Sequence, residues 1–210
     1  MKILVIIPIT GLEKQDIEER LTFLRSIARA GTEVNYIQVE DGPPAVESPV
    51  DHTVASAEVL KHVKKAEEEG YDAIISWCAG DPGVEAARTM VDIPVVGPGE
   101  SMRLLASILG KKVCGVTTGL PVLEMRKDLG KTINLLKEAI EERVKEGYDS
   151  FYLSCLALTG LGKVLREETG LPVIDGAEAS LKITELLAEL KLKPSRIAYP
   201  KYPPPHRRQT

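Results

Sequence analysis

The sequence predicts an α/β protein with two pseudo-symmetric three-layer α/β/α lobes, each built on a mainly parallel sheet, and a cleft between the lobes. Two observations lead to this fold. Short apolar segments alternate with amphipathic helical segments, and the second half of the chain repeats the first in shortened form. At 210 residues, 43% of them hydrophobic, the chain can form one buried domain or two small lobes that share an interface.

Seven segments rich in β-branched residues have the length of strands. They lack a clean alternation of apolar and polar residues, which is typical of parallel strands covered on both faces. The predicted strands are 2–8, 33–39, 72–77, 93–96, 112–117, 149–154 and 171–174.

Amphipathic helices are predicted between these strands. One apolar face is formed by Ile17, Leu21, Leu24 and Ala28, and another by Ile133, Leu136, Ile140 and Val144. Several helices are expected to end at a glycine in the left-handed conformation. These glycines are Gly31, Gly70, Gly110, Gly147 and Gly170.

The internal repeat is clearest around two cysteines. EGYDAIISWCAG at 69–80 matches EGYDSFYLSCLA at 146–157, and each is followed by a helix and a second matching strand, in IPVVGPGES at 93–101 and LPVIDGAEAS at 171–180. Each copy is also preceded by a strand that ends in threonine and glycine. The chain is therefore predicted to be a duplicated unit.

The two copies differ in length. The first contains an extra helix and strand at 13–39, where the second has only the short segment 120–131. We expect a first lobe at 1–97, completed by a C-terminal helix at about 177–199, and a shortened second lobe at 98–176. The proline-rich segment 200–210 is expected to be a flexible tail, or alternatively an arm that bridges subunits.

Composition limits the function classes. A net charge of −4 gives no electrostatic footprint for nucleic acid or an anionic membrane, so small molecules are the expected partners. The apolar segments are strand-sized and the N-terminus lacks a signal peptide, which predicts a cytoplasmic protein with free thiols. Abundant Lys and Glu with few Asn and Gln is a hyperthermophile pattern.

Cys78 and Cys155 are the candidate catalytic residues. Ligands of parallel sheets bind at the carboxyl ends of the strands, where both cysteines lie, so lobes that face each other would bring the thiols to opposite sides of one cleft. A thiolate on one side and a thiol on the other can invert a carbon by removing and returning a proton. The alternative for either cysteine is core packing, as we expect for Cys114.

A catalytic thiolate requires a lowered pKa, which a helix N-terminus can supply. After Cys78, Asp81 is the predicted N-cap and Pro82 the first residue of the next helix. The N–H groups at that helix start would also lie near a bound carboxylate, which makes Asp81 a candidate substrate-binding residue. Thr159 is the candidate cap after Cys155.

Five motifs in order resemble the hydantoin racemase branch of the aspartate/glutamate racemase superfamily over most of residues 1–190. They are GPPAVESPVDH at 42–52, CAGDPG at 78–83, IPVVGPGES at 93–101, GVTTG at 115–119 and LPVIDG at 171–176. The resemblance implies racemisation without a cofactor by Cys78 and Cys155. It also implies that a substrate carboxylate or carbonyl is held by Thr10, Glu47, Ser48, Thr117 and Thr118. Each threonine has an alternative role as a helix cap or turn residue.

The hypothesis is therefore a racemase or epimerase of an amino acid or hydantoin-like substrate, a cofactor-independent isomerase that works as a homo-oligomer. The three histidines of the chain lack the spacing of metal ligands, so no metal site is expected. Two alternatives remain. One is a cysteine-dependent enzyme similar to maleate cis-trans isomerase or arylmalonate decarboxylase, and the other is a non-catalytic protein that binds a small carboxylate.

Overall fold

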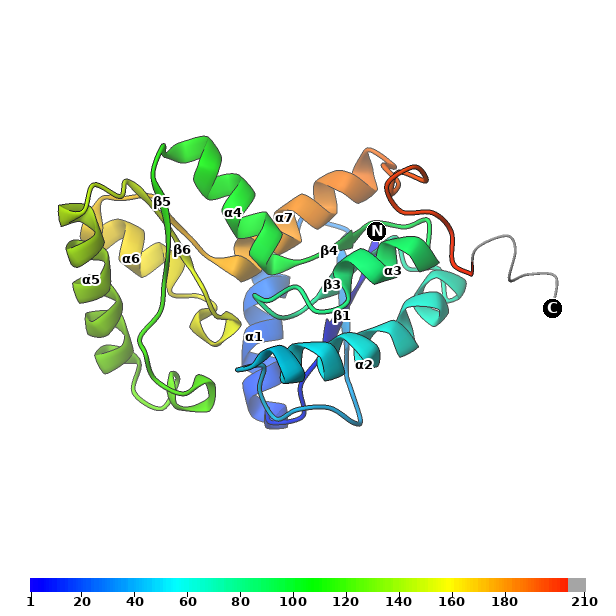
Figure 1. Cartoon of the computed structure of the whole chain (residues 1–210), viewed down its shortest axis with the longest axis horizontal. Coiled ribbons are helices and arrows are strands. Elements are labelled where there is room, and N and C mark those ends of the chain that lie inside the picture. Colours follow the sequence, from blue (N-terminus) through cyan, green and yellow to red (C-terminus); the bar gives the residue numbers. More distant parts are fainter. Residues whose placement is uncertain (204–210) are drawn as a thin grey trace.

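Two separate parallel sheets frame the protein, one from each half of the repeat (Figure 1). The computed structural model describes residues 1–203. The first sheet has the order β2-β1-β3-β4 and the second the order β5-β6-β7, and every pairing is parallel. All seven predicted strands are present, each shorter at one or both ends. They are β1 (Lys2–Ile7), β2 (Glu33–Gln38), β3 (Ala73–Ser76), β4 (Val95–Val96), β5 (Val113–Val116), β6 (Ser150–Leu153) and β7 (Val173–Ile174).

Helices cover both faces of the first sheet. On one face, Ile3 and Val5 of β1 pack with Leu21 of α1 (Lys14–Ile27) and Leu181 of α7 (Gly176–Glu189). On the other face, residues of β1 and β3 pack with α2 (Pro49–Glu68) and α3 (Val84–Met90). The buried residues at successive positions of β1 therefore serve two different cores, which explains why the strand shows no polar face.

The second sheet is also enclosed on both sides. Its larger core is formed with α5 (Leu129–Lys145) and α6 (Gly162–Thr169), including Leu136 and Leu165. The opposite face packs against α4 (Pro98–Leu109), through Met102 and Ala106. The predicted α/β fold with three layers around each sheet is confirmed.

The two halves exchange their last helices. Helix α4 follows β4 of the first sheet yet packs on the second sheet, whereas α7 follows β7 of the second sheet yet packs on the first. The two helices contact each other, and Figure 1 shows them meeting near the centre of the molecule and diverging towards opposite sides. The proposed lobe boundaries at 97 and 176 stay a prediction.

The repeat extends to side-chain contacts. Arg88 donates to the Val95 carbonyl and pairs with Glu100 at the start of α4. At the matching positions, Arg166 donates to the Val173 carbonyl and pairs with Glu178 at the start of α7, with an N–O distance of 2.9 Å.

The length difference between the copies is also as predicted. The extra segment at 13–39 forms α1 and β2, which widen the first sheet. In the second copy, 120–131 contains only the 3-10 turn η1 (Val122–Glu124) and the start of α5. The buried Thr132 hydroxyl donates to the Met125 carbonyl at 2.6 Å and anchors this segment to α5.

Three predictions about helix ends were wrong. Gly70, Gly147 and Gly170 have the expected positive φ at a helix end, but α1 ends at Ile27 with the extended Ala28 as C-cap, before Gly31. Gly110 follows α4 as expected but is extended, with φ of −140°. A glycine is needed there because a Cβ would lie 2.4 Å from Cβ of Ser150. The helix predicted at about 177–199 ends at Glu189, shortly before Lys191 turns with φ of 54°.

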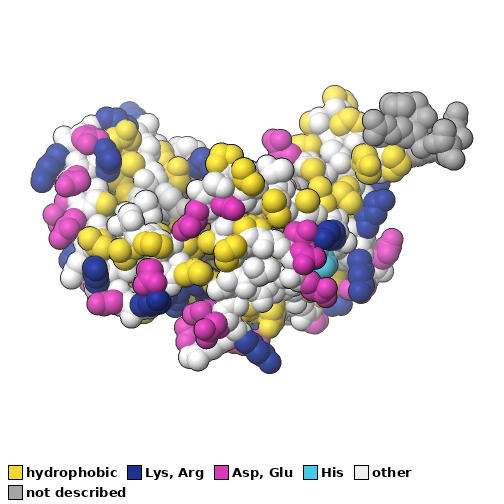
Figure 2. Space-filling model, turned by 60° about the horizontal axis from the view of Figure 1, so that its bottom comes forward, with side chains coloured by type: hydrophobic (Ala, Val, Ile, Leu, Met, Phe, Trp, Pro, Cys, Tyr) yellow, Lys and Arg dark blue, Asp and Glu magenta, His cyan; other side chains and the backbone are white. Residues whose placement is uncertain are grey.

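The surface carries a mixture of charges. On the face in Figure 2, acidic and basic side chains are interspersed and neither sign gathers into a large area. Among residues 1–203, no helix is both long and apolar enough to cross a membrane. Most of the predicted tail at 200–210, from residue 204 onward and including His206, lies outside the described residues.

Candidate active site

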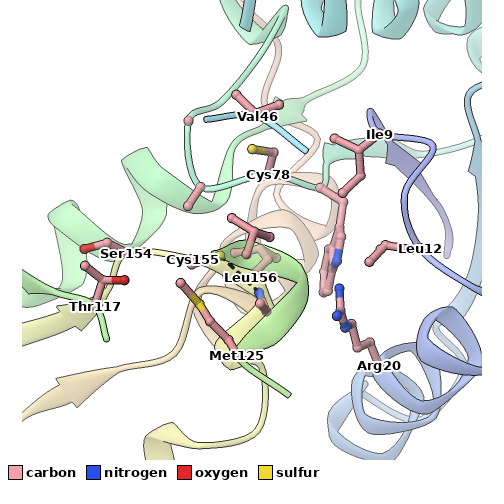
Figure 3. A pocket seen from close by; sticks show the side chains of 15 residues that line it. Ile9, Leu12, Arg20, Val46, Cys78, Thr117, Met125, Ser154, Cys155 and Leu156 are labelled. Atoms are coloured by element: carbon pink, nitrogen blue, oxygen red, sulfur yellow. Dashed lines mark hydrogen bonds between the residues drawn. The ribbon is translucent and has the colours of Figure 1, made fainter. Parts of the chain in front are cut away.

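A cavity of about 370 Å³ lies where the carboxyl ends of strands from both sheets meet. Residues after β1, β3, β5 and β6 form its wall, and α1 and the 120–131 segment complete it (Figure 3). Most of the side chains are apolar. The lining residues are Ile9, Leu12, Arg20, Val46, Trp77, Cys78, Ala79, Gly80, Thr117, Val122, Met125, Ser154, Cys155, Leu156 and Ala157.

Cys78 lies in a tight turn after β3. Its side chain lines the same cavity as that of Cys155. The backbone N–H of Gly80 donates to the Cys78 sulfur. His52 of α2 holds this turn from behind, since its Nε2 lies 2.9 Å from the Gly80 carbonyl oxygen. Gly80 therefore holds the sulfur through its N–H group, while His52 fixes the Gly80 carbonyl.

Cys155 follows β6 and begins the 3-10 turn η2 (Leu156–Leu158). The backbone N–H of Ala157 donates to its sulfur at 3.4 Å. Leu156 packs into the core between the first sheet and α7, which fixes the second cysteine turn against the first half of the protein. The facing of the two halves depends partly on this contact.

The thiols are not acidified as the sequence led us to expect. Burial raises the pKa of Cys78 to about 11, and negative charge on Cys155 and Asp81 adds to this effect, against the N–H of Gly80. Burial also raises the pKa of Cys155, while the N–H of Ala157 and the charge of Arg20 oppose it and Glu47 reinforces it. The apolar cavity wall is the physical reason, because it disfavours the charged thiolate.

Asp81 caps a different helix from the one predicted. Its φ of 56° turns the chain, and α3 begins only at Val84 with Gly83 as N-cap. The Asp81 carboxylate accepts hydrogen bonds from the backbone N–H groups of Gly99 at 2.6 Å and Glu100 at 2.7 Å, at the start of α4. The predicted cap Thr159 is also not one, because its hydroxyl donates to the Leu156 carbonyl and α6 has Leu161 as its N-cap.

Among the other candidate substrate-binding residues, Thr117 lines the cavity. Its hydroxyl has no hydrogen-bond partner within residues 1–203. Thr118 instead accepts from the Leu120 N–H in a turn, at 3.2 Å. Ser48 is the N-cap of α2, and the exposed Thr10 donates to the Gly42 carbonyl at 3.4 Å.

Glu47 connects the two halves beside the cavity. Its carboxylate accepts from the Val122 N–H at 3.2 Å, across to the short 120–131 segment. Val122 and Met125 of that segment line the cavity. The short replacement for a helix and strand therefore still contributes to the cavity wall.

Arg20, Trp77 and Ser154 line the cavity and were not among the predicted site residues. Arg20 had a detectable signal, because it lies between Ile17 and Leu24 on the buried face of α1. Trp77 and Ser154 each precede a predicted catalytic cysteine. Within residues 1–203, no three His, Cys, Asp or Glu side chains are arranged to hold a metal ion.

Comparison with known proteins agrees with this architecture. The family model described as Asp/Glu/Hydantoin racemase matches residues 3–126. The chain belongs to the Asp/Glu/hydantoin racemase family. A hydantoin racemase from Pseudomonas sp. (strain NS671) is 33% identical, over 97% of this chain and 92% of its own length.

Solved structures of two allantoin racemases and of a decarboxylase have the same fold. An allantoin racemase from Klebsiella pneumoniae is 28% identical, covers 96% of this chain and 94% of its own, and gives a TM-score of 0.87. For the allantoin racemase of Pseudomonas fluorescens the identity is 27%, the coverage 97% and 98%, and the TM-score 0.89. Arylmalonate decarboxylase, at 15% identity and a TM-score of 0.61, shares the fold alone. These relatives identify the chain as a racemase, an enzyme of the isomerase class.

Proposed function

We propose that this racemase inverts the α-carbon of an amino acid or hydantoin-like substrate without a cofactor, with Cys78 and Cys155 as alternating base and acid. One thiolate removes the α-proton from one face of the carbon, and the opposite thiol donates a proton to the other face. In the reverse direction the two sulfurs exchange these roles. Because each transfer moves one proton, every turnover leaves the pair ready for the opposite enantiomer.

The observation that carries this proposal is the shared cavity wall. Cys78 and Cys155 come from matching positions of the repeat, and both line one cavity between the two sheets. A single cysteine at a strand end is often a packing residue. Two at equivalent positions on one cavity suit a substrate that must be handled from both faces.

The apolar surroundings favour strong bases. Burial raises the pKa of both thiols, so each thiolate, once formed, binds a proton more strongly than a thiolate in water. An α-proton next to a carbonyl is weakly acidic, and a more basic thiolate reduces the energetic cost of removing it. In this cavity less thiolate is present at neutral pH, but each thiolate is a stronger base.

The Thr117 hydroxyl is our candidate for stabilising the enolate-like intermediate. It lines the cavity and has no partner among residues 1–203. Because this hydroxyl is not committed to another acceptor, it can donate to the oxygen on which negative charge develops. We propose a supporting role for five further residues, which hold the loops around the cavity in place through hydrogen bonds to backbone groups. They are Thr10, Glu47, Ser48, Asp81 and Thr118.

Proton exchange in heavy water tests the proposal. Amino acids, 5-substituted hydantoins, allantoin and small dicarboxylates are incubated with the protein, and loss of the α-proton signal is followed by NMR. We expect protein-dependent exchange and racemisation of one class. Both should be absent in the Cys78→Ala, Cys155→Ala double variant and retained in Cys114→Ala, whose thiol is outside the cavity wall.

Other outcomes would contradict the proposed mechanism. Racemisation by the double variant at the parent rate would exclude the two cysteines as the catalytic acid and base. A covalent adduct of one cysteine with an unsaturated dicarboxylate would favour isomerase chemistry, and ligand-induced thermal stabilisation without exchange of any substrate would favour a binding protein. The cytoplasmic location, homo-oligomeric state and thermophilic origin stay predictions.

A further inference from the structure

Arg20 is a buried cation in the wall of the cysteine cavity. It extends from α1, only 7% of its surface is exposed, and it lines the cavity together with both cysteines. In Figure 3 the labelled Thr117 and Ser154 lie on one side of the cavity and Arg20 on the other, with Cys78 and Cys155 between them. The charge is therefore placed within reach of a molecule that contacts the sulfurs.

The guanidinium has no partner in the described part of the chain. Its Nε is fully buried and lacks an acceptor, and within residues 1–203 Arg20 forms no hydrogen bond and no ion pair. Asp16 and Glu19 influence it only through longer-range charge interaction. A buried, unpaired cation is costly, so the fold retains this residue at the expense of stability.

The neighbouring Arg126, in contrast, has a structural role. Arg126 donates to the carbonyl oxygens of Ala157 at 3.2 Å and Thr159 at 3.1 Å, and lies 3.8 Å from the carboxylate of Glu19. It thereby braces the Cys155 turn. Within residues 1–203 Arg20 makes no comparable contact, so no acceptor in this part of the chain satisfies it.

We propose that Arg20 binds a carboxylate of the substrate, so that the preferred substrate is an acyclic α-amino acid or N-carbamoyl amino acid rather than an uncharged hydantoin ring. A guanidinium and a carboxylate fit each other through two parallel N–H···O bonds, which also fix orientation. The remaining wall, including Ile9, Leu12 and Trp77, suits an apolar substituent. The reaction assigned to this substrate rests on the proposed function, but its binding does not.

Binding can be measured without turnover by using two ligands that have no α-proton. N-carbamoyl-α-methylphenylalanine carries a carboxylate, and 5-benzyl-5-methylhydantoin has the same substituent on an uncharged ring at neutral pH. Affinities are determined by calorimetry for the parent, Arg20→Met, Arg20→Lys and the control Arg25→Met. Arg25 lies on the same helix, and its guanidinium is partly exposed and paired with Glu18.

We expect the parent to bind the carboxylate ligand more tightly than the hydantoin. Arg20→Met should lose roughly 100-fold in affinity for the carboxylate and little for the hydantoin, because a charge-assisted bond in an apolar site is removed. Arg20→Lys should keep part of the affinity, and Arg25→Met all of it. Arg20→Met should also unfold at no lower urea concentration than the parent, since it removes an unpaired buried charge.

Two results would overturn the inference. One is equal loss of both ligands in Arg20→Met, or no loss of either. The other is failure of Arg20→Met to fold, which would make Arg20 a structural residue. The proposed function is judged separately, because cysteine-dependent exchange of a hydantoin that is unaffected in Arg20→Met would uphold the racemase mechanism and reject the carboxylate.

Discussion

In both cysteine turns the backbone N–H two residues after the cysteine donates to the sulfur, from Gly80 to Cys78 and from Ala157 to Cys155. In both, an aspartate also ties the turn to the helix that crosses to the other half. The two aspartates are not equivalent in sequence, however. In one half the aspartate belongs to the cysteine turn and in the other half it belongs to the helix, yet both connect the turn with the helix.

Asp81 belongs to the Cys78 turn and reaches forward to the N–H groups of Gly99 and Glu100 at the start of α4. Its counterpart after Cys155 is the apolar Leu158. There the carboxylate belongs to the helix, because Asp175 caps α7 and reaches back to the N–H groups of Gly160 and Gly162. Gly97, which matches Asp175, leaves room for Asp81, since a Cβ on Gly97 would lie 2.3 Å from the Asp81 oxygen.

The charges around the two sulfurs differ in sign. The charges that raise the pKa of Cys78 are negative and come from Cys155 and Asp81. Cys155 has the positive Arg20 as well as the negative Glu47. Duplication supplied two matched thiols, and later divergence of their surroundings makes Cys155 the thiol that we expect to ionise first.

The largest expected effect tests what the two turns share. Burial raises the pKa of both thiols, to about 11 for Cys78. Well below the pKa, the thiolate fraction grows tenfold with each pH unit, so kcat/KM should rise about 100-fold from pH 6 to pH 8. Initial racemisation rates by polarimetry, corrected for the double cysteine variant, measure this. A flat profile over that range would mean that a thiolate is already present at pH 6.

The aspartate supports should differ in strength. Asp175 is 1% exposed and accepts N–H groups from both the turn and α7. Asp175→Ala should lower the free energy of unfolding by about 2 kcal/mol, and Asp81→Ala by about 1 kcal/mol as for a helix cap. Urea unfolding by circular dichroism compares them. A larger loss of unfolding free energy for Asp81→Ala than for Asp175→Ala would show that Asp81 is the stronger support.

The third effect concerns the order of ionisation. Because Arg20 opposes the raised pKa of Cys155, iodoacetamide should modify Cys155 roughly ten times faster than Cys78 near pH 8, as judged by peptide mass spectrometry. In Arg20→Met the pH dependence of Cys155 modification should move to higher pH, with that of Cys78 unchanged. Faster modification of Cys78 in the parent would contradict the assignment.

The smallest effect is a pH dependence of stability. Burial raises the pKa of Asp175 to about 6, whereas an unfolded Asp titrates near 3.9. The folded state therefore holds the proton more tightly, and this contribution is lost as the pH rises through 6. The stability difference between the parent and Asp175→Ala should be about 1 kcal/mol larger at pH 5 than at pH 8. A difference that grows with pH would show a lowered pKa instead.

The sequence was sufficient for the strands, which depend on local apolar patterns, and for the duplication, which is written in the repeated motifs. It was also sufficient for the expectation that both cysteines reach one cavity, because both follow predicted parallel strands. It was insufficient where distant parts of the chain meet. The pKa direction of Cys78 depends on the apolar wall that both halves build, and the φ of Asp81 redirects its carboxylate from α3 to α4. Arg20 was not predicted, because a cation on an apolar helix face usually lies at the edge of that face with its charged group in water.

The most direct test of two-base racemisation uses the single variants Cys78→Ala and Cys155→Ala with each pure enantiomer of the substrate in heavy water. With one thiol left, a proton can be removed and returned on one face only. Each variant should therefore exchange the α-proton of one enantiomer with retained configuration, and the two variants should act on opposite enantiomers. Continued interconversion by either single variant, or exchange of the same enantiomer by both, would contradict the account.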